Sequence, residues 1–225
     1  MTAMTVTSEV FQDPQVVALY EAASRGDVAE VHALKEAGAN LDARGKLGIT
    51  PALWATIQRD AVALTTLLDA GADPSSVDDE GHPPLQWAAR YEDPAFMRTL
   101  LSHGADPDAR THLDNPVLFV AIDEGYWHYV EALLDAGADV NAVGRGGHTA
   151  LHRAAMANQF ERVGFLLDRG ADPAAVDDTG GTAALYVQES LVDPDSENAA
   201  AQPKARAALA AHGVKFPVPR PWESP

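Results

Sequence analysis

The sequence contains no cysteine, and this absence excludes several kinds of chemistry. A chain of 225 residues without a thiol forms no disulfide bond and has no cysteine nucleophile. It also lacks the cysteine ligands of the common structural zinc sites. The absence is consistent with a reducing compartment.

Basic residues are scarce as well. The chain has 16 Lys and Arg against 33 Asp and Glu, which gives a formal net charge of −17. A surface this acidic repels phosphate backbones and anionic lipids, so we expect neither a nucleic acid nor a membrane as partner. A basic protein partner is left open, because the same charge attracts it.

Long apolar runs are also missing. No segment approaches the ~18–20 apolar residues of a membrane span. The first residues, MTAMTVTSEVFQDP, have neither the basic start nor the apolar run of a secretory signal, and we therefore expect a cytoplasmic protein. The hydrophobic fraction of 46% is nevertheless sufficient for a folded core.

What the sequence does contain is a repeat. Gly-Ala-Asp or Gly-Ala-Asn recurs at intervals of 33 residues, beginning at Gly38, Gly71, Gly104, Gly137 and Gly170. An apolar pattern that ends in leucine precedes each glycine and predicts one face of an amphipathic helix. The glycine predicts the end of that helix, because the residue after a helix commonly has a left-handed backbone. A period of this length is typical of repeat architectures.

A second helix start recurs in the same register, as GITPALWAT, GHPPLQWAA, DNPVLFVAI, GHTALHRAA and GGTAALYVQ. These starts, with the Ala-Ala and Leu-Leu pairs and Gly-Ala-Asp, resemble the ankyrin repeat family. The resemblance covers roughly residues 15–216. It implies a mainly α fold, a solenoid of stacked helix pairs joined by short β-hairpin loops, with about six repeats including terminal caps. The third start departs from the family pattern, since Asp114 stands where the family has glycine.

The repeat sets the expected boundaries. We expect a flexible N-terminus (1–14), a single ankyrin-repeat domain (15–216) and an extended Pro-rich tail (217–225). The expected subdivisions of the domain are the capping repeat 15–44, the repeats 45–77, 78–110, 111–143 and 144–176, and the C-terminal repeat 177–216. The last repeat contains about ten inserted residues within a polar segment, 191–203, which is expected to be a surface loop. Trp222 is expected to pack on the last helix or, alternatively, to contact a partner.

His148 and His152 raise the question of a metal site, because two histidines four residues apart on a helix hold zinc in some enzymes. A zinc site needs three or four ligands, and the glutamate of the His-Glu-x-x-His motif is absent. His152 occupies the family's Leu-His position, where the resemblance implies a structural role between neighbouring hairpins. We therefore expect no metal and no cofactor.

The resemblance implies that partners bind on the concave side, which is built from hairpin tips and the exposed ends of the first helices. Charge alternates along the tips, from Arg44 and Lys46 to Asp78–Glu80 and on to Arg145. Tyrosine and arginine on this side favour a binding surface, since both are frequent at interface hot spots. The predicted protein-binding residues are His82, Arg90, Tyr91, His112, Leu113, Asn115, Arg145, His148 and Met156.

Three functions are compatible with these features. The leading interpretation is a non-enzymatic, monomeric module that binds a protein partner. The second is a cytoplasmic inhibitor or immunity protein that neutralises a basic enzyme or toxin. The third is an enzyme that uses carboxylates such as Asp123 and Glu124. No set of nucleophile, base and oxyanion donors can be assembled from the sequence, which favours the non-enzymatic interpretations.

Overall fold

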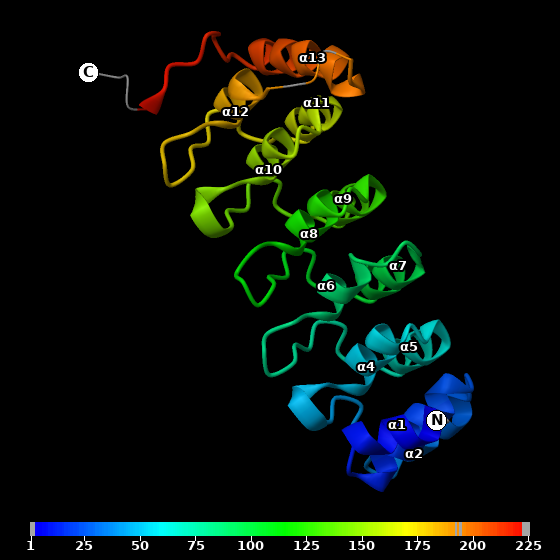
Figure 1. The fold of residues 1–225 in the computed structure, drawn as a ribbon. Helices are drawn as coiled ribbons and strands as arrows, with labels where there is room; N and C mark the ends of the chain where they lie inside the picture. Colours follow the sequence, from blue (N-terminus) through cyan, green and yellow to red (C-terminus); the bar gives the residue numbers. More distant parts are fainter. Residues whose placement is uncertain (1–2, 192, 194, 222–225) are drawn as a thin grey trace. The chain divides into compact units, whose positions relative to one another are not determined.

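The computed structural model of the chain describes residues 3–191, 193 and 195–221. The chain forms two compact units, Met1–His112 (unit 1) and Leu113–Pro225 (unit 2). Each unit is a stack of antiparallel helix pairs with loops between successive pairs (Figure 1). The prediction of a mainly α fold of stacked helix pairs is confirmed.

The helices of unit 1 are α1 (Ala3–Val10), α2 (Pro14–Ser24), α3 (Val28–Glu36), α4 (Pro51–Gln58), α5 (Ala61–Asp69), α6 (Pro84–Ala88) and α7 (Ala95–Ser102). Those of unit 2 are α8 (Val117–Asp123), α9 (Trp127–Asp135), α10 (Ala150–Met156), α11 (Phe160–Asp168), α12 (Ala183–Glu189) and α13 (Glu197–Ala211). Consecutive helices form pairs, from α2 with α3 to α12 with α13. Within unit 2 the first helices α8, α10 and α12 pack in a row, and the second helices α11 and α13 pack on each other.

The helix boundaries follow from local chemistry. Asp27 caps α3 by accepting the N–H of Glu30 at 3.0 Å, and Asp60 caps α5 by accepting the N–H of Ala63 at 2.9 Å. The five glycines of the period have φ between +85° and +104°, as the helix ends require. At Gly71, for example, the next N–H, that of Ala72, donates back to Leu67 O at 3.0 Å. This bond is the Schellman arrangement that satisfies a helix C-terminus.

The core lies between the layers of first and second helices. The leucine that precedes the glycine fills it in four of the repeats, where Leu67, Leu100, Leu133 and Leu166 are fully buried, while Leu34 is only partly buried. Alanines such as Ala88 and Ala155 are buried as well, which allows the helices to approach closely. Burial of each leucine contributes about 1.5–3 kcal/mol to the stability of the stack.

The loops between pairs are fingers that project on the side of the first helices (Figure 1). We define the fingers as residues 44–50 and 77–83 in unit 1 and 143–149 and 176–182 in unit 2. Each finger is closed by a backbone hydrogen bond from an N–H to the carbonyl oxygen four residues later. The donor and acceptor pairs are Gly45 and Ile49, Asp78 and His82, Gly144 and His148, and Asp177 and Gly181. Where β-hairpins were expected, the described residues form short 3₁₀ turns, Lys46–Gly48 and Arg145–Gly147, and isolated bridge contacts such as that between Val176 and Thr182.

The N-terminal segment differs from the expectation of a flexible 1–14. Residues Ala3–Val10 form α1, and Phe11 is 2% exposed. Phe11 lies against the first finger so closely that a Cβ at Gly45 would come within 2.7 Å of its ring. The segment therefore covers the end of unit 1. Removal of the apolar Phe11 side chain from water supplies the free energy that holds it there.

The inserted segment 191–203 also differs from the expectation, because only its first part is a loop. Helix α13 begins at Glu197. Ala201, Ala205 and Leu209 recur every four residues on its buried face, which predicts a helix rather than a loop. Pro203 lies inside the helix and is exposed, and it supplies no N–H to the carbonyl four residues earlier.

Candidate protein interface

The nine predicted binding residues are divided between the two units. Unit 1 contains His82, Arg90, Tyr91 and His112, and unit 2 contains Leu113, Asn115, Arg145, His148 and Met156. Each group therefore has to be assessed within its own unit.

His82, in the finger 77–83, is engaged by contacts within unit 1. Its Nδ1 lies 2.9 Å from Oδ2 of Asp78, and only 14% of its side chain is exposed. Its ring packs on that of His112, with 4.5 Å between the centroids. Burial raises the pKa of Asp78, but the hydrogen bonds from the backbone and side chain of His82 outweigh burial and leave this pKa lowered. His82 therefore holds its own finger together.

Tyr91 lies largely in the interior, so little of its side chain is accessible to a partner. Its side chain is 6% exposed and packs edge-on against Phe96, while its hydroxyl donates to Thr56 O at 3.0 Å. The guanidinium of Arg59 covers the ring at 4.2 Å from its centroid. Burial raises the pKa of Tyr91 even though Arg59 opposes this shift. The neighbouring Arg90 is exposed and remains accessible.

Asn115 and Arg145 are brought together in unit 2. The side-chain oxygen of Asn115 accepts the backbone N–H of Arg145 at 2.8 Å. This contact requires glycine at position 144, since a Cβ there would lie 2.5 Å from the same oxygen. Asn115 thereby fixes the start of the finger 143–149 and leaves the Arg145 side chain exposed.

Two of the predicted binding residues of unit 2 are apolar side chains that are open to solvent, as Val143, Val176 and Leu191 are as well. Leu113 is 46% exposed, and Met156, at the end of α10, is 45% exposed. Isolated exposed apolar side chains are common on protein surfaces. Leu113 precedes α8 and Met156 ends α10, so both belong to the first-helix layer of the unit.

His148 takes part in a polar network between the two fingers of unit 2. Its Nε2 lies 3.7 Å from Oδ2 of Asp177, whose side chain is fully buried. Burial raises the pKa of Asp177, but hydrogen bonds from Thr179, Tyr186 and Gly181 outweigh it and depress this pKa strongly. The same carboxylate, together with burial, raises the pKa of the Tyr186 hydroxyl that donates to it. His148 is 21% exposed, so one edge of its ring is open to a partner.

His152 has the structural position that the resemblance implied. Its Nδ1 accepts the backbone N–H of Thr149 at 3.2 Å, which leaves Nε2 as the donor to Gly181 O at 3.2 Å. Its ring is fully buried, and burial lowers the pKa of His152. His152 thus links the start of α10 to the neighbouring finger as a neutral imidazole.

Some of the opposite charges that alternate along the tips form ion pairs between neighbouring fingers. Arg44 Nη2 lies 2.9 Å from Asp79 Oδ1 on the next finger, and its Nη1 donates to Val77 O at 3.0 Å. In unit 2, Nε2 of His148 lies 3.7 Å from Oδ2 of Asp177 on the next finger. The charges of Arg44 and Asp79 are therefore paired within the fold, and this pair is a weaker indicator of a partner than the sequence suggested.

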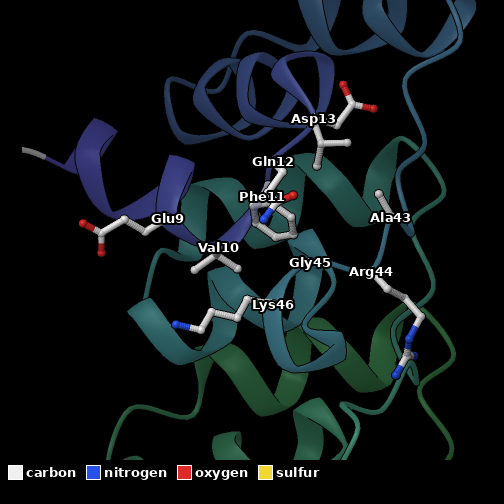
Figure 2. A pocket seen from close by; sticks show the side chains of 10 residues that line it. Glu9, Val10, Phe11, Gln12, Asp13, Ala43, Arg44, Gly45 and Lys46 are labelled. Atoms are coloured by element: carbon white, nitrogen blue, oxygen red, sulfur yellow. The ribbon is translucent and has the colours of Figure 1, made fainter.

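The carboxylates considered for catalysis do not converge. Asp123 accepts from Arg153 Nε at 3.1 Å and is half-exposed. A pocket of about 700 Å³ lies between the α1–α2 connection and the first finger (Figure 2). Figure 2 shows that two carboxylates of its lining, Glu9 and Asp13, point to different sides. Over residues 3–191, 193 and 195–221, no group of three or more His, Asp and Glu side chains could hold a metal ion.

Sequence reasoning missed two residues that hold the tail, Gln188 and Glu189. The side-chain amide of Gln188 makes two hydrogen bonds with the backbone of Val218, and Glu189 pairs with Arg220 at 2.5 Å. Glu189 is one repeat after Met156, so the equivalence of positions could have identified it. Trp222, considered above as a packing residue, lies outside the described residues.

Comparison with known proteins agrees with this architecture. A family model of ankyrin repeats (3 copies) matches residues 19–111 and 109–177, more than half of the chain. The ankyrin repeat domain of Bcl-3, described as a unique member of the IkappaB protein family, is 26% identical with a TM-score of 0.72, over 90% of this chain and 89% of that chain. An ankyrin repeat domain from Acinetobacter baumannii AYE is 27% identical with a TM-score of 0.71, over 88% and 98%.

A comparison with curated proteins gave no match. Among the helices formed by the described residues, none is long and apolar enough to cross a membrane. The stacked helix pairs, the 33-residue register and the family match lead to one conclusion: the chain belongs to the ankyrin repeat family.

Proposed function

We propose that this protein is a non-enzymatic module that binds a protein partner through the finger and first-helix side of unit 2. Ankyrin repeats are typically protein-binding modules. The observation that carries the assignment to unit 2 is the exposure of Leu113, Met156 and Arg145, which lie in or next to its fingers and first helices. Exposed apolar side chains beside an arginine have the composition of an interface centre.

The Arg145 side chain supports this choice. Its backbone is fixed by Asn115, while its guanidinium takes part in no ion pair within the described part of the chain. A partner that pairs with it gains a charge-assisted contact without breaking one inside the protein. In unit 1 the equivalent surface offers Arg90 and His112, because Tyr91 and His82 are engaged internally.

The charge of the chain supports a basic partner. With a net charge of −17, a partner with an excess of Lys and Arg is attracted from solution and associates faster at low salt. The proposal places the protein in the cytoplasm as a monomer. The same charge favours a second candidate, an inhibitor or immunity protein that neutralises a basic enzyme or toxin. Rescue of growth when the chain is co-expressed with a toxic partner would support this role.

Affinity capture from native cytosol tests the proposal. The tagged wild-type protein is compared with a Leu113→Asp, Met156→Asp double variant, which places carboxylates on the proposed surface. The matched control is Val28→Asp, Val62→Asp, since these side chains of unit 1 are 47% and 52% exposed on second helices. We expect one stoichiometric partner with the wild type and the control, and a loss of at least about tenfold with the double variant.

Equal recovery by all three proteins would rule out the proposed surface. Recovery of no partner at wild-type concentrations above the micromolar range would argue against the binding function itself.

A further inference from the structure

The C-terminal segment 214–221 of unit 2, which we call the strap, lies along the side proposed for binding. It leaves α13 after Gly213, whose φ of +92° turns the chain back, and it passes α12 (Figure 1). It reaches Glu189, the residue one repeat after Met156, and Gly180 in the finger 176–182. One repeat earlier, the equivalents of Gln188 and Gly180 are Ala155, which is 1% exposed, and Gly147, which lies against Asp178 of the next finger, so the strap covers surface that a following repeat would cover.

The central contact of the strap is made to its backbone. Val218 N–H donates to Oε1 of Gln188 at 2.7 Å, and Nε2 of Gln188 donates to Val218 O at 3.1 Å. One side-chain amide thus pairs with both polar groups of a single residue. Such a contact recognises an extended backbone and does not depend on the side chain of Val218.

The sequence of the strap suits this contact. In Phe216-Pro-Val-Pro-Arg-Pro, prolines alternate with other residues, so that only Val218 and Arg220 carry a backbone N–H between Pro217 and Pro221. The prolines also fix φ, which reduces the conformational entropy lost when the segment docks. Gln188 therefore pairs with one of the few donors that an alternating proline segment has.

Side chains of the strap also contact unit 2, through an ion pair, a close approach of Pro221 to Gly180 and a cation–π contact. Arg220 Nε lies 2.5 Å from Oε1 of Glu189, and both side chains are partly exposed, at 47% and 37%. Pro221 passes so close to Gly180 that a Cβ there would lie 3.1 Å from its Cβ. Near α13, the guanidinium of Arg206 lies 5.0 Å from the centroid of the Phe216 ring.

We infer that the surface formed by Gln188, Glu189 and Gly180 is a docking site for an extended, proline-alternating segment that carries an arginine, and that the strap occupies it until a partner segment displaces it. The contacts that hold the strap include the Gln188 amide and a partly exposed ion pair between Arg220 and Glu189. Exposed ion pairs contribute little to stability, so the strap can be released. As an intramolecular ligand it competes at high effective concentration with any segment from outside. The inference rests on the proposed protein-binding function and specifies the chemistry of its ligand.

The test uses the full chain and a fluorescent peptide with the strap sequence, VKFPVPRP. Arg220→Glu weakens the strap in the protein, and Lys204→Glu on α13 is the control with the same change of charge. We expect the peptide to bind Arg220→Glu at least about tenfold more tightly than it binds the wild type or the control, because the competing strap is weakened. A peptide that is N-methylated at the valine lacks the donor for Gln188 and should bind at least about tenfold more weakly.

Hydrogen exchange provides a second readout that requires no added ligand. In the wild type the Val218 amide should exchange slowly, and in Gln188→Ala it should exchange at least about tenfold faster with the rest of unit 2 unchanged. The inference is overturned if folded Arg220→Glu does not bind the peptide, or if the methylated and unmethylated peptides bind equally. These results depend on Gln188 and Glu189 and not on Leu113 or Met156, so a failure here is distinguishable from a failure of the capture experiment.

Discussion

At the scale of single residues, one position of the repeat shows how a buried polar group is either satisfied or left unpaired. His152 is fully buried, and both of its ring nitrogens are bonded, to Thr149 N–H and Gly181 O. Gln86 occupies the equivalent position in unit 1, is 2% exposed, and its Oε1 has no hydrogen-bond partner among the described residues. An unpaired buried oxygen costs stability, whereas a paired ring contributes to it.

Replacing each residue by leucine should therefore have opposite effects. His152→Leu leaves the buried N–H of Thr149 without a partner and removes one of the two donors to Gly181 O, so it should lower the free energy of unfolding by about 1–3 kcal/mol. Gln86→Leu removes the unpaired oxygen and should raise it by about 1 kcal/mol, since the same position holds the buried Leu53 in the preceding repeat. Urea unfolding followed by circular dichroism measures both variants. A loss of stability in Gln86→Leu as large as that in His152→Leu would contradict this interpretation.

His152 should also make stability depend on pH. Burial lowers its pKa in the folded protein below the unfolded value of about 6.5, so the unfolded chain binds the proton more readily. The stabilising contribution is present above that unfolded value and is lost as the pH falls through the folded pKa. His148, Asp177 and Tyr186 lie near the ring, so the variant serves as the reference.

The measurement compares urea midpoints near pH 7.5 and near pH 5.5 for the wild type and His152→Leu. The wild type should lose more stability between these pH values than the variant does. Identical pH dependence in the two proteins would show that His152 does not titrate in this range.

At the scale of elements, α1 and the residue after it behave as the end cap of unit 1. Phe11 is 2% exposed and lies against the first finger at Gly45. A repeat at the end of a stack has no neighbour on one side, so an additional segment has to cover its apolar surface. The short helix followed by Phe11 supplies that cover.

Phe11→Ala should therefore lower the free energy of unfolding of unit 1 by about 3–4 kcal/mol, since it removes a buried aromatic side chain. The matched control is Gln12→Ala, because Gln12 is exposed and its replacement should change stability by less than about 0.5 kcal/mol. Thermal unfolding followed by circular dichroism measures both. Equal midpoints for the two variants would indicate that the N-terminal segment contributes nothing to the fold.

At the scale of the whole molecule, excess negative charge opposes compaction. The chain has 33 acidic and 16 basic residues, and the charges that the fingers pair, such as Arg44 with Asp79, are half-exposed. Exposed pairs contribute little to stability. The repulsion between the remaining carboxylates is therefore the larger electrostatic effect.

Salt should consequently stabilise the protein. Raising NaCl from about 0.02 M to about 0.3 M shortens the Debye length and should raise the urea midpoint. The same change should weaken the binding of a basic partner, because it screens the attraction between the two proteins. A urea midpoint that falls with added salt would mean that the paired finger charges dominate over the repulsion.

The sequence by itself determined the period, the helix pairs and their ends. These features depend on local rules. Gly71 and Gly137 each end a helix because glycine adopts a left-handed backbone without strain, and Leu67 and Leu133 each mark the buried face of a helix. It also assigned His152 its structural place through the family resemblance. The repeat register made this possible, because each position carries the same environment in successive units.

Only the tertiary structure decided which side chains are available to a partner. Tyrosine is a residue type that is frequent at interfaces, but Arg59, Thr56 and Phe96 enclose the Tyr91 side chain. Arg44 and Asp79 alternate in sign along the sequence, yet their charges are used between neighbouring fingers. The strap is bound to Gln188 through contacts 30 residues apart in the sequence. Exposure and pairing depend on neighbours that are distant in the chain, and no local pattern specifies them.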